Sequence, residues 1–129
     1  MENPNELKYS KEHEWVRLEG DIATVGVTYF AQKQLTDIVF VELPEKGKNV
    51  EQGKQMAVIE SVKSVSDVFS PVSGEVIEVN DKLKDNPELI NNEPYGAGWI
   101  AKIKAVNKDE LNNLMSADDY DKFVSETKH

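Results

Sequence analysis

The chain has 129 residues, of which 39% are hydrophobic, so it is long enough to form one compact domain with a buried core. It has no Cys and two His, which excludes a disulfide scaffold, a Cys nucleophile and a Cys-ligated metal site, and disfavours a multi-His metal site. Its 24 acidic and 15 basic side chains give a net charge of −9, which repels phosphate groups, so neither nucleic acid nor a membrane is an expected partner.

The N-terminal part is typical of short strands separated by turns. Residues 14–18 and 22–27 are strand candidates, and the Gly-containing turn between them predicts a hairpin. Gly26 inside the second strand indicates a bulge or a close approach of another group. Thr28 is a suitable N-cap for the short helix predicted over residues 28–35.

Four further strands are predicted in the middle of the chain, over residues 38–43, 55–61, 66–70 and 75–80. The second and third of these flank a polar tetrad, Ser61-Val62-Lys63-Ser64. The pattern therefore places Lys63 at the tip of a hairpin.

The last third of the chain changes character. Residues 87–90 read as a single helical turn, 94–98 as a loop and 99–105 as a half-exposed strand. Apolar residues at helical spacing then predict two short helices, with Ser116 as a cap between them. Their apolar stripes are interpreted as core contacts.

Two sequence patterns outside the hairpin invite a functional interpretation. Residues 96–101 match the glycine-rich dinucleotide fingerprint, but a loop precedes them and a strand follows, whereas the fingerprint needs a strand before it and a helix after it. His13, between two glutamates, is either a general base or an ordinary half-exposed residue at a strand start. No nucleophile, phosphate-loop or zinc motif accompanies it, so the chain does not read as a self-sufficient enzyme.

Lys63 is the remaining candidate. An exposed lysine with an ordinary pKa near 10.4 is protonated at neutral pH, so the sequence gives no sign of an activated base. At a hairpin tip it is well placed for presentation to a modifying enzyme. Spacing alone leaves two interpretations equally open, a modification site and one solvated lysine among many.

The stretch around this lysine, ESVKSVSD at 60–67 followed by SPVSGEV at 70–76, closely resembles the lipoyl-attachment region of the glycine cleavage H-protein family. Other matching blocks, in order, lie at 9–10, 13–16, 23–28, 37–44, 91, 94–95 and 98–100. Two departures are visible: Thr36 stands where the family usually has Gly, and Ser64 where Ala often follows the modified lysine. Gly fills a left-handed helix end more easily than Thr, so the geometry at Thr36 is open to question.

The resemblance implies a mainly β fold, the lipoyl/biotinyl-carrier hammerhead, which is a flattened β-sandwich or barrel with a short internal helix and C-terminal helices. It implies a single domain over residues 1–129, with a core at about 7–106 and a helical segment at about 107–126. It also implies a carrier and not an enzyme, with lipoic acid bound covalently to Lys63.

The implied function is to shuttle the aminomethyl group of glycine among the enzymes of the glycine cleavage system. The partners are a pyridoxal-phosphate glycine decarboxylase (P-protein), a folate-dependent aminomethyltransferase (T-protein), a dihydrolipoyl dehydrogenase (L-protein) and a lipoate-attaching enzyme. By position in the matching motifs, Glu14 and Asp67 are candidates to hold the amine of the loaded arm. The other interpretation of both residues is that of solvated acids at strand ends.

Three alternatives remain. A lipoate relay that donates lipoyl groups to other lipoyl domains uses the same lysine, so the sequence does not separate it from the shuttle. A biotin carrier is disfavoured because the Met-Lys-Met pattern is absent at Lys63. A small enzyme using His13 is the third. We expect a monomer in the bacterial cytoplasm, or in the mitochondrial matrix if a leader has been removed, since no signal or membrane-length apolar segment is visible.

Overall fold

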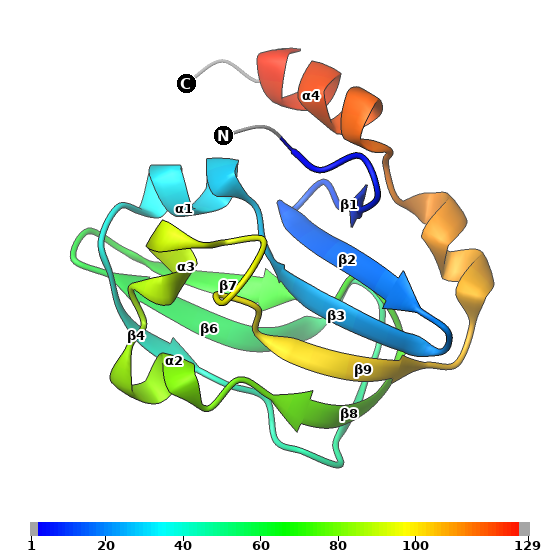
Figure 1. Cartoon of the computed structure of the whole chain (residues 1–129), viewed down its shortest axis with the longest axis horizontal. Coiled ribbons are helices and arrows are strands. Elements are labelled where there is room, and N and C mark those ends of the chain that lie inside the picture. The colour runs from blue at the N-terminus through cyan, green and yellow to red at the C-terminus, as the bar shows by residue number, and fades with distance from the viewer. Residues whose placement is uncertain (1–2, 127–129) are drawn as a thin grey trace.

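The computed structural model describes residues 3–126 and contains two antiparallel β-sheets with short helices around them (Figure 1). The larger sheet has the strand order β1-β2-β3-β9-β8-β5, and the smaller one has the order β4-β6-β7. The strands of the larger sheet are β1 (Lys8–Tyr9), β2 (Glu14–Glu19), β3 (Ile22–Val27), β5 (Asn49–Val50), β8 (Gly74–Val79) and β9 (Ala101–Ala105). Those of the smaller sheet are β4 (Ile38–Glu42), β6 (Gln55–Ser61) and β7 (Val65–Phe69). The helices are α1 (Tyr29–Leu35), α2 (Lys82–Asp85), α3 (Leu89–Asn92), the 3-10 helix η1 (Lys108–Asn113) and α4 (Ala117–Glu126).

The main hydrophobic core combines apolar residues of both sheets. Side chains from the larger sheet, such as Val25 and Ile103, belong to the same buried cluster as Val41 and Ile59 from the smaller one. Each fully buried side chain of this size contributes about 1.5–3 kcal/mol relative to exposure. The expected class, a mainly β flattened sandwich with a short internal helix and C-terminal helices, is confirmed.

Gly26 marks a close approach, as its position inside a strand predicted. A Cβ atom at Gly26 would lie 2.8 Å from atoms of the Trp15 ring. That ring is fully buried, and its Nε1–H donates to the Pro94 carbonyl at 2.8 Å. Trp15 therefore lies over a position that has to lack a side chain.

Helix α1 begins and ends as the sequence indicated. The Thr28 hydroxyl accepts a hydrogen bond from the N–H of Ala31 at 3.2 Å, which confirms the predicted cap. The helix ends at Thr36, whose φ of 65° and ψ of −146° fall in a region that favours glycine. The Asn91 side chain holds this end, because its Nδ2 donates to the Thr36 carbonyl at 2.8 Å while its Oδ1 accepts from the Ile38 N–H at 2.9 Å.

Some short elements differ from the sequence expectation. Strands β1 and β5 have two residues each, too few for a periodic signal, and were not predicted. The single helical turn expected at 87–90 is replaced by two separate turns, α2 and α3, of four residues each. The first C-terminal helix is the 3-10 helix η1, and the Ser116 hydroxyl accepts from the Asp119 N–H at 3.2 Å at the start of α4.

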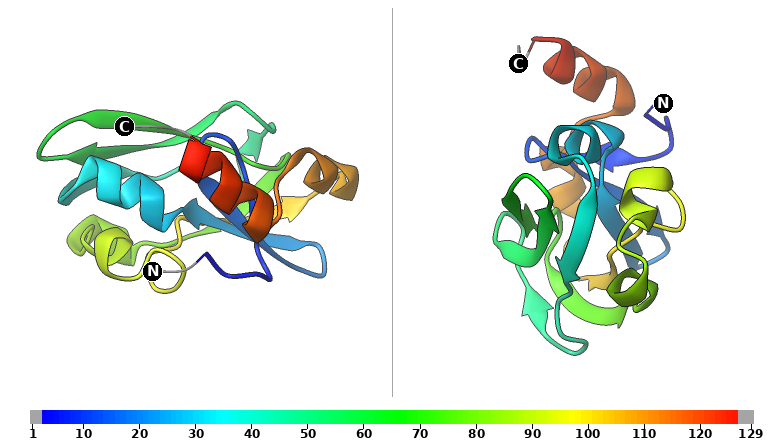
Figure 2. Two further views of the ribbon diagram at one scale, coloured as in Figure 1. Left: turned by 90° about the horizontal axis from the view of Figure 1, so that it is seen from above. Right: turned by 90° about the vertical axis from the view of Figure 1, so that its left-hand side faces the viewer.

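Helix α1 lies between the β6–β7 hairpin on one side and α2 and α3 on the other (Figure 2). Helix α4 packs outside the larger sheet, next to β1, over a second buried cluster. This cluster consists of Leu7, Tyr9, Trp15, Ala117 and Tyr120.

Candidate lipoyl-attachment site

Lys63 lies at the tip of the hairpin formed by β6 and β7, as the sequence predicted. The hydroxyl of Ser61 accepts from the N–H of Lys63 at 3.1 Å and from the N–H of Ser64 at 3.0 Å. The N–H of Ser61 donates to the Ser64 carbonyl at 2.8 Å, and the N–H of Val62 donates to the Asp37 carbonyl at 3.0 Å. Residues 61–64 thus form a closed turn that is also tied to the start of β4.

The side chain of Lys63 is exposed and reaches the end of helix α1. Its Nζ donates to the Gln34 carbonyl at 3.3 Å, one residue before the helix ends. An ammonium group at this place meets the negative end of the helix dipole, which stabilises it modestly. This contact could not be predicted from the sequence, because Gln34 contributes only its main-chain carbonyl.

Glu14 is buried, with 2% of its surface exposed, so the interpretation as a solvated acid is wrong for this residue. Its Oε1 accepts from the Ser10 hydroxyl at 2.5 Å, and its Oε2 accepts from the Phe69 N–H at 3.1 Å. Burial raises the pKa of the Glu14 carboxyl from 4.5 to about 7, against the lowering effect of these two hydrogen bonds. The charge of Glu12 raises this pKa further.

A cavity of about 180 Å³ opens at Glu14. Its other lining residues include Ser10, Glu12, Gln52 and Leu114. The cavity therefore joins the loop before β2 to the residues around η1. A buried carboxyl with a raised pKa thus forms part of the lining of a surface hollow.

Asp67 lies apart from this hollow. It is exposed on the outer face of the smaller sheet, and its Oδ1 accepts from the Gln55 side chain at 3.1 Å. It stands two residues before Phe69, whose main chain bonds Glu14, so the two candidate acids are connected through β7 without touching. The interpretation as a solvated acid fits Asp67.

His13 is part of an aromatic cluster beneath α4. Its Nδ1 is 2.7 Å from the Tyr120 hydroxyl, which is in turn 2.7 Å from the Thr28 hydroxyl. The imidazole also contacts the ring of Phe30, with centroids 4.6 Å apart. His13 has a φ of 72°, so it forms a left-handed corner before β2 instead of starting the strand. These contacts give His13 a role in holding α1 and α4 together.

The structure also answers the sequence-based questions about a dinucleotide fingerprint, a metal site and a membrane-spanning segment. Residues 94–98 form turns and strand β9 follows, as expected for a loop and not for a dinucleotide-binding helix. Within residues 3–126, no group of three or more His, Asp or Glu side chains is arranged to hold a metal ion. No helix in the described part of the chain is long and apolar enough to cross a membrane.

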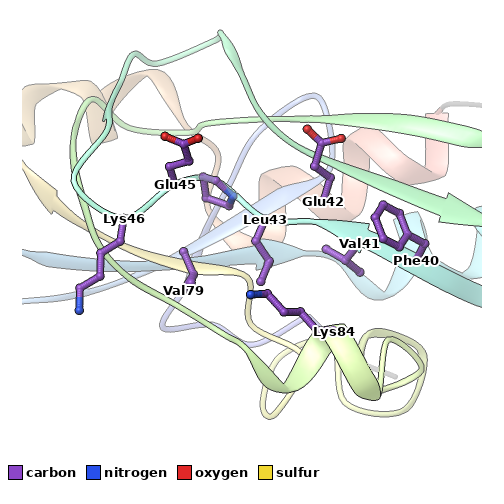
Figure 3. A pocket seen from close by; sticks show the side chains of 9 residues that line it. Phe40, Val41, Glu42, Leu43, Glu45, Lys46, Val79 and Lys84 are labelled. Atoms are coloured by element: carbon purple, nitrogen blue, oxygen red, sulfur yellow. The ribbon is translucent and has the colours of Figure 1, made fainter.

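A larger cavity, about 630 Å³ in volume, lies beside β4 and contains neither Lys63 nor Glu14 (Figure 3). Phe40, Leu43, Val79 and Lys84 are among its lining residues. This hollow is mostly apolar and separate from the Glu14 cavity.

A β-sandwich with an exposed lysine on a closed hairpin turn is the arrangement typical of carrier domains in which a lysine bears the carried group. The family model for the glycine cleavage H-protein matches residues 7–127. The glycine cleavage system H protein of Symbiobacterium thermophilum is 58% identical over 95% of this chain and 96% of its own length. That of Halothermothrix orenii is 53% identical over 99% of this chain and 100% of its own.

The comparison of structures agrees. The crystal structure of a glycine cleavage system H protein from Mycobacterium marinum has a TM-score of 0.86 and 37% identity, covering 95% of this chain and 99% of that one. The chain therefore belongs to the glycine cleavage H-protein family. Proteins of this family are lipoyl carriers and not catalysts, so the expected carrier function is confirmed at this level.

Proposed function

We propose that this chain is the lipoyl carrier of a glycine cleavage system and that Lys63 bears the lipoyl group. The observation that carries the assignment is the exposed Lys63 on a turn closed by Ser61. An amine that a second enzyme has to reach must stand clear of its own protein, and within residues 3–126 the Lys63 Nζ donates to a single partner, the Gln34 carbonyl. When bound, the lipoyl group supplies a dithiolane that accepts the aminomethyl group derived from glycine.

Glu14 is the residue we propose for holding the amine of the loaded arm. Helix α1 connects the two places: its last turn contacts Lys63, and the Thr28 N–H at its start donates to the His13 carbonyl at 3.0 Å, next to Glu14. A helix of seven residues spans about 10 Å, a distance comparable to a lysine extended by an acyl chain. A carboxylate and an ammonium in a partly buried cleft form a strong, charge-assisted hydrogen bond.

Asp67 is less suitable than Glu14 for holding the amine of the loaded arm. Its exposure and its bond to Gln55 leave it screened by solvent, so we propose that it assists only on the path between Lys63 and the cleft.

The partners follow from membership of the system: the glycine decarboxylase, the aminomethyltransferase and the dihydrolipoyl dehydrogenase. We add a lipoate-attaching enzyme, because the lysine has to be acylated first. We also propose that residues 1–129 act as one domain and as a monomer, and that the protein works in the bacterial cytoplasm, where its bacterial relatives suggest it belongs.

The experiment that tests the assignment is peptide mapping by mass spectrometry of protein purified from its native host. A lipoyl group on Lys63 is expected, and a lipoyl group on another lysine would contradict the proposal. Reconstituted glycine cleavage and lipoyl transfer to a separate lipoyl domain, measured on the same preparation, distinguish the shuttle from a lipoate relay. Glycine cleavage is expected to be restored, and lipoyl transfer without glycine cleavage would favour the relay.

A further inference from the structure

Exposed apolar side chains gather at one end of the smaller sheet, around the base of Lys63. In the described part of the chain, four of the five large apolar residues that are exposed lie on β4 and the β6–β7 hairpin. These four residues, which we call the collar, are Val39, Phe40, Val62 and Val65, with 53%, 51%, 69% and 65% of their surfaces exposed. A contiguous exposed apolar patch on a small protein marks an interaction site more often than scattered apolar residues do.

The pairing of the strands explains why the collar residues are exposed. Phe40 pairs with Glu60, and Glu60 pairs with Val65, so these three side chains form one row across the outer face of the sheet. The register of β4 against β6 shifts between Ile38 and Phe40. This irregularity leaves Val39 and Phe40 exposed in succession, where regular alternation would bury one of them.

The same outer face is acidic. Glu60 lies in the row of the collar, and the next row carries Glu42 and Asp67 on either side of Val58. Neither row contains Lys or Arg, and the three ion pairs found within residues 3–126 involve none of these carboxylates. The patch therefore combines apolar side chains with one carboxylate, Glu60, between Phe40 and Val65, and two more in the next row. A partner surface that mixes apolar and basic side chains complements it.

We propose that the collar is the docking surface for the enzyme that acylates Lys63, so that this enzyme recognises β4 as well as the hairpin that bears the lysine. The inference rests on the proposed function and adds a recognition surface to it. The enzyme binds through an apolar entrance lined with Lys or Arg. Phe40 also forms part of the wall of the cavity in Figure 3, which gives an apolar side chain of the partner a hollow to enter.

The short distance from the lysine Cα to its Nζ favours the attaching enzyme, and not an enzyme of the glycine cleavage cycle, as the partner that docks on the collar. The Nζ atom of a lysine stands only about 6 Å from its Cα, so an enzyme that acts on Nζ has to bring its entrance against the residues next to the turn. An enzyme that acts on the dithiolane works a further acyl chain away and can stand clear of the collar.

The step itself is an acyl transfer from an activated acyl donor that the enzyme supplies, an acyl adenylate. The Lys63 ammonium loses one proton to a base of the enzyme, the neutral amine attacks the carbonyl carbon, and a second proton leaves the nitrogen as the amide forms. The C–N bond forms, the bond from that carbon to the phosphate oxygen breaks, and AMP leaves with the electron pair.

The test is the rate of lipoyl attachment by the purified host enzyme, followed by intact mass, for Val39→Lys and a matched control. Val106→Lys is that control, because Val106 is 74% exposed and follows β9, whose end lies across the molecule from the hairpin (Figure 1). A lysine in the collar places like charges together and removes apolar contact, so kcat/KM for attachment is expected to fall about tenfold or more. Val106→Lys is expected to react at the wild-type rate.

A second measurement uses Val39→Lys protein that has been lipoylated fully by prolonged incubation. Its glycine cleavage rate with the three other enzymes is expected to match that of the wild type. Normal attachment of Val39→Lys, or an equal loss in Val106→Lys, would overturn the proposal. Normal attachment with slow glycine cleavage would assign the collar to a cleavage enzyme instead. Failure of the wild type to accept lipoate on Lys63 would overturn the proposed function itself, whatever the collar variants do.

Discussion

The main-chain N–H of Phe69 donates to Oε2 of Glu14 at 3.1 Å, which joins an edge of the smaller sheet to the first residue of β2. This bond orients the Glu14 carboxyl from β7, the strand that follows the turn bearing Lys63. The Ser10 hydroxyl fixes it from the other side. The carboxyl is therefore held in one orientation, as its proposed role in holding an amine requires.

Glu14→Gln is expected to shorten the lifetime of the aminomethyl-loaded protein. The amide has the same shape, but it cannot form a charge-assisted bond with the amine, and such bonds contribute about 1.5–3 kcal/mol. Loss of the loaded form is expected to be roughly tenfold faster, as measured by intact mass over time. Asp67→Asn, the exposed counterpart, is expected to have a smaller effect. An unchanged lifetime in Glu14→Gln removes Glu14 from the site.

Lys63→Arg is expected to keep the fold and the charge while abolishing lipoyl attachment. Arginine retains the cation near the Gln34 carbonyl, but its guanidinium group is not acylated. The unfolding free energy is expected to change by no more than about 0.5 kcal/mol. Restoration of glycine cleavage by purified Lys63→Arg protein would contradict the assignment.

The pKa of Glu14 predicts a pH dependence of stability. The folded-state pKa of about 7 lies above the ordinary value of 4.5, so the folded protein binds this proton more tightly than the unfolded chain. The resulting stabilisation is complete below pH 4.5 and is lost as the pH rises to 7, a change of about 3 kcal/mol.

Urea unfolding at pH 5 and pH 8 measures this effect. Glu14→Gln lacks the titrating group, so its unfolding free energy relative to the wild type is expected to be higher at pH 8 than at pH 5. Glu75→Gln, at an exposed position in β8, is the control and is expected to show no such difference. Parallel pH profiles for wild type and Glu14→Gln would refute the prediction.

Gly26→Ala is expected to destabilise the protein by about 1–3 kcal/mol, because the new methyl group overlaps the buried Trp15 ring. Thermal unfolding with Trp fluorescence detects both the loss of stability and the displaced ring. The control is Gly20→Asn, at a turn position with a φ of 63° and open space around it, where Asn is tolerated. Equal stability of Gly26→Ala and the wild type would show that Trp15 moves freely.

Thr36→Gly is expected to raise the unfolding free energy by about 1 kcal/mol. The backbone of Thr36 has a φ of 65° and a ψ of −146°, which costs a residue with a Cβ about 1–3 kcal/mol. Glycine loses more entropy on folding, which offsets part of this gain. Thr36→Ala keeps the Cβ and is the control. A Tm for Thr36→Gly at or below that of Thr36→Ala would count against the strain.

The longer elements follow from local patterns, whereas the details of the site depend on tertiary contacts. The strands around Gly26 and Lys63, and the cap at Thr28, are encoded within a few residues of themselves, so the sequence predicts them closely. The Glu14 carboxyl is held by the main chain of Phe69, which is 55 residues away in the chain. The contact of Lys63 with the Gln34 carbonyl leaves no mark in the sequence, because every residue has a main-chain carbonyl. The position of Glu14 in a matching motif made it a candidate, whereas the burial that raises the pKa of its carboxyl is visible only in the folded structure.

The turn that Ser61 closes has a kinetic consequence. Four hydrogen bonds hold the backbone of residues 61–64, so cargo carried on Lys63, as we propose, moves by side-chain rotation about a fixed backbone position. The volume it searches is then a small shell, which keeps its effective concentration high at any active site that lies within the shell. On the proposed function, Ser61→Gly loosens the turn, enlarges that volume and dilutes the cargo, so the speed of delivery depends on a serine two residues away from the attachment point.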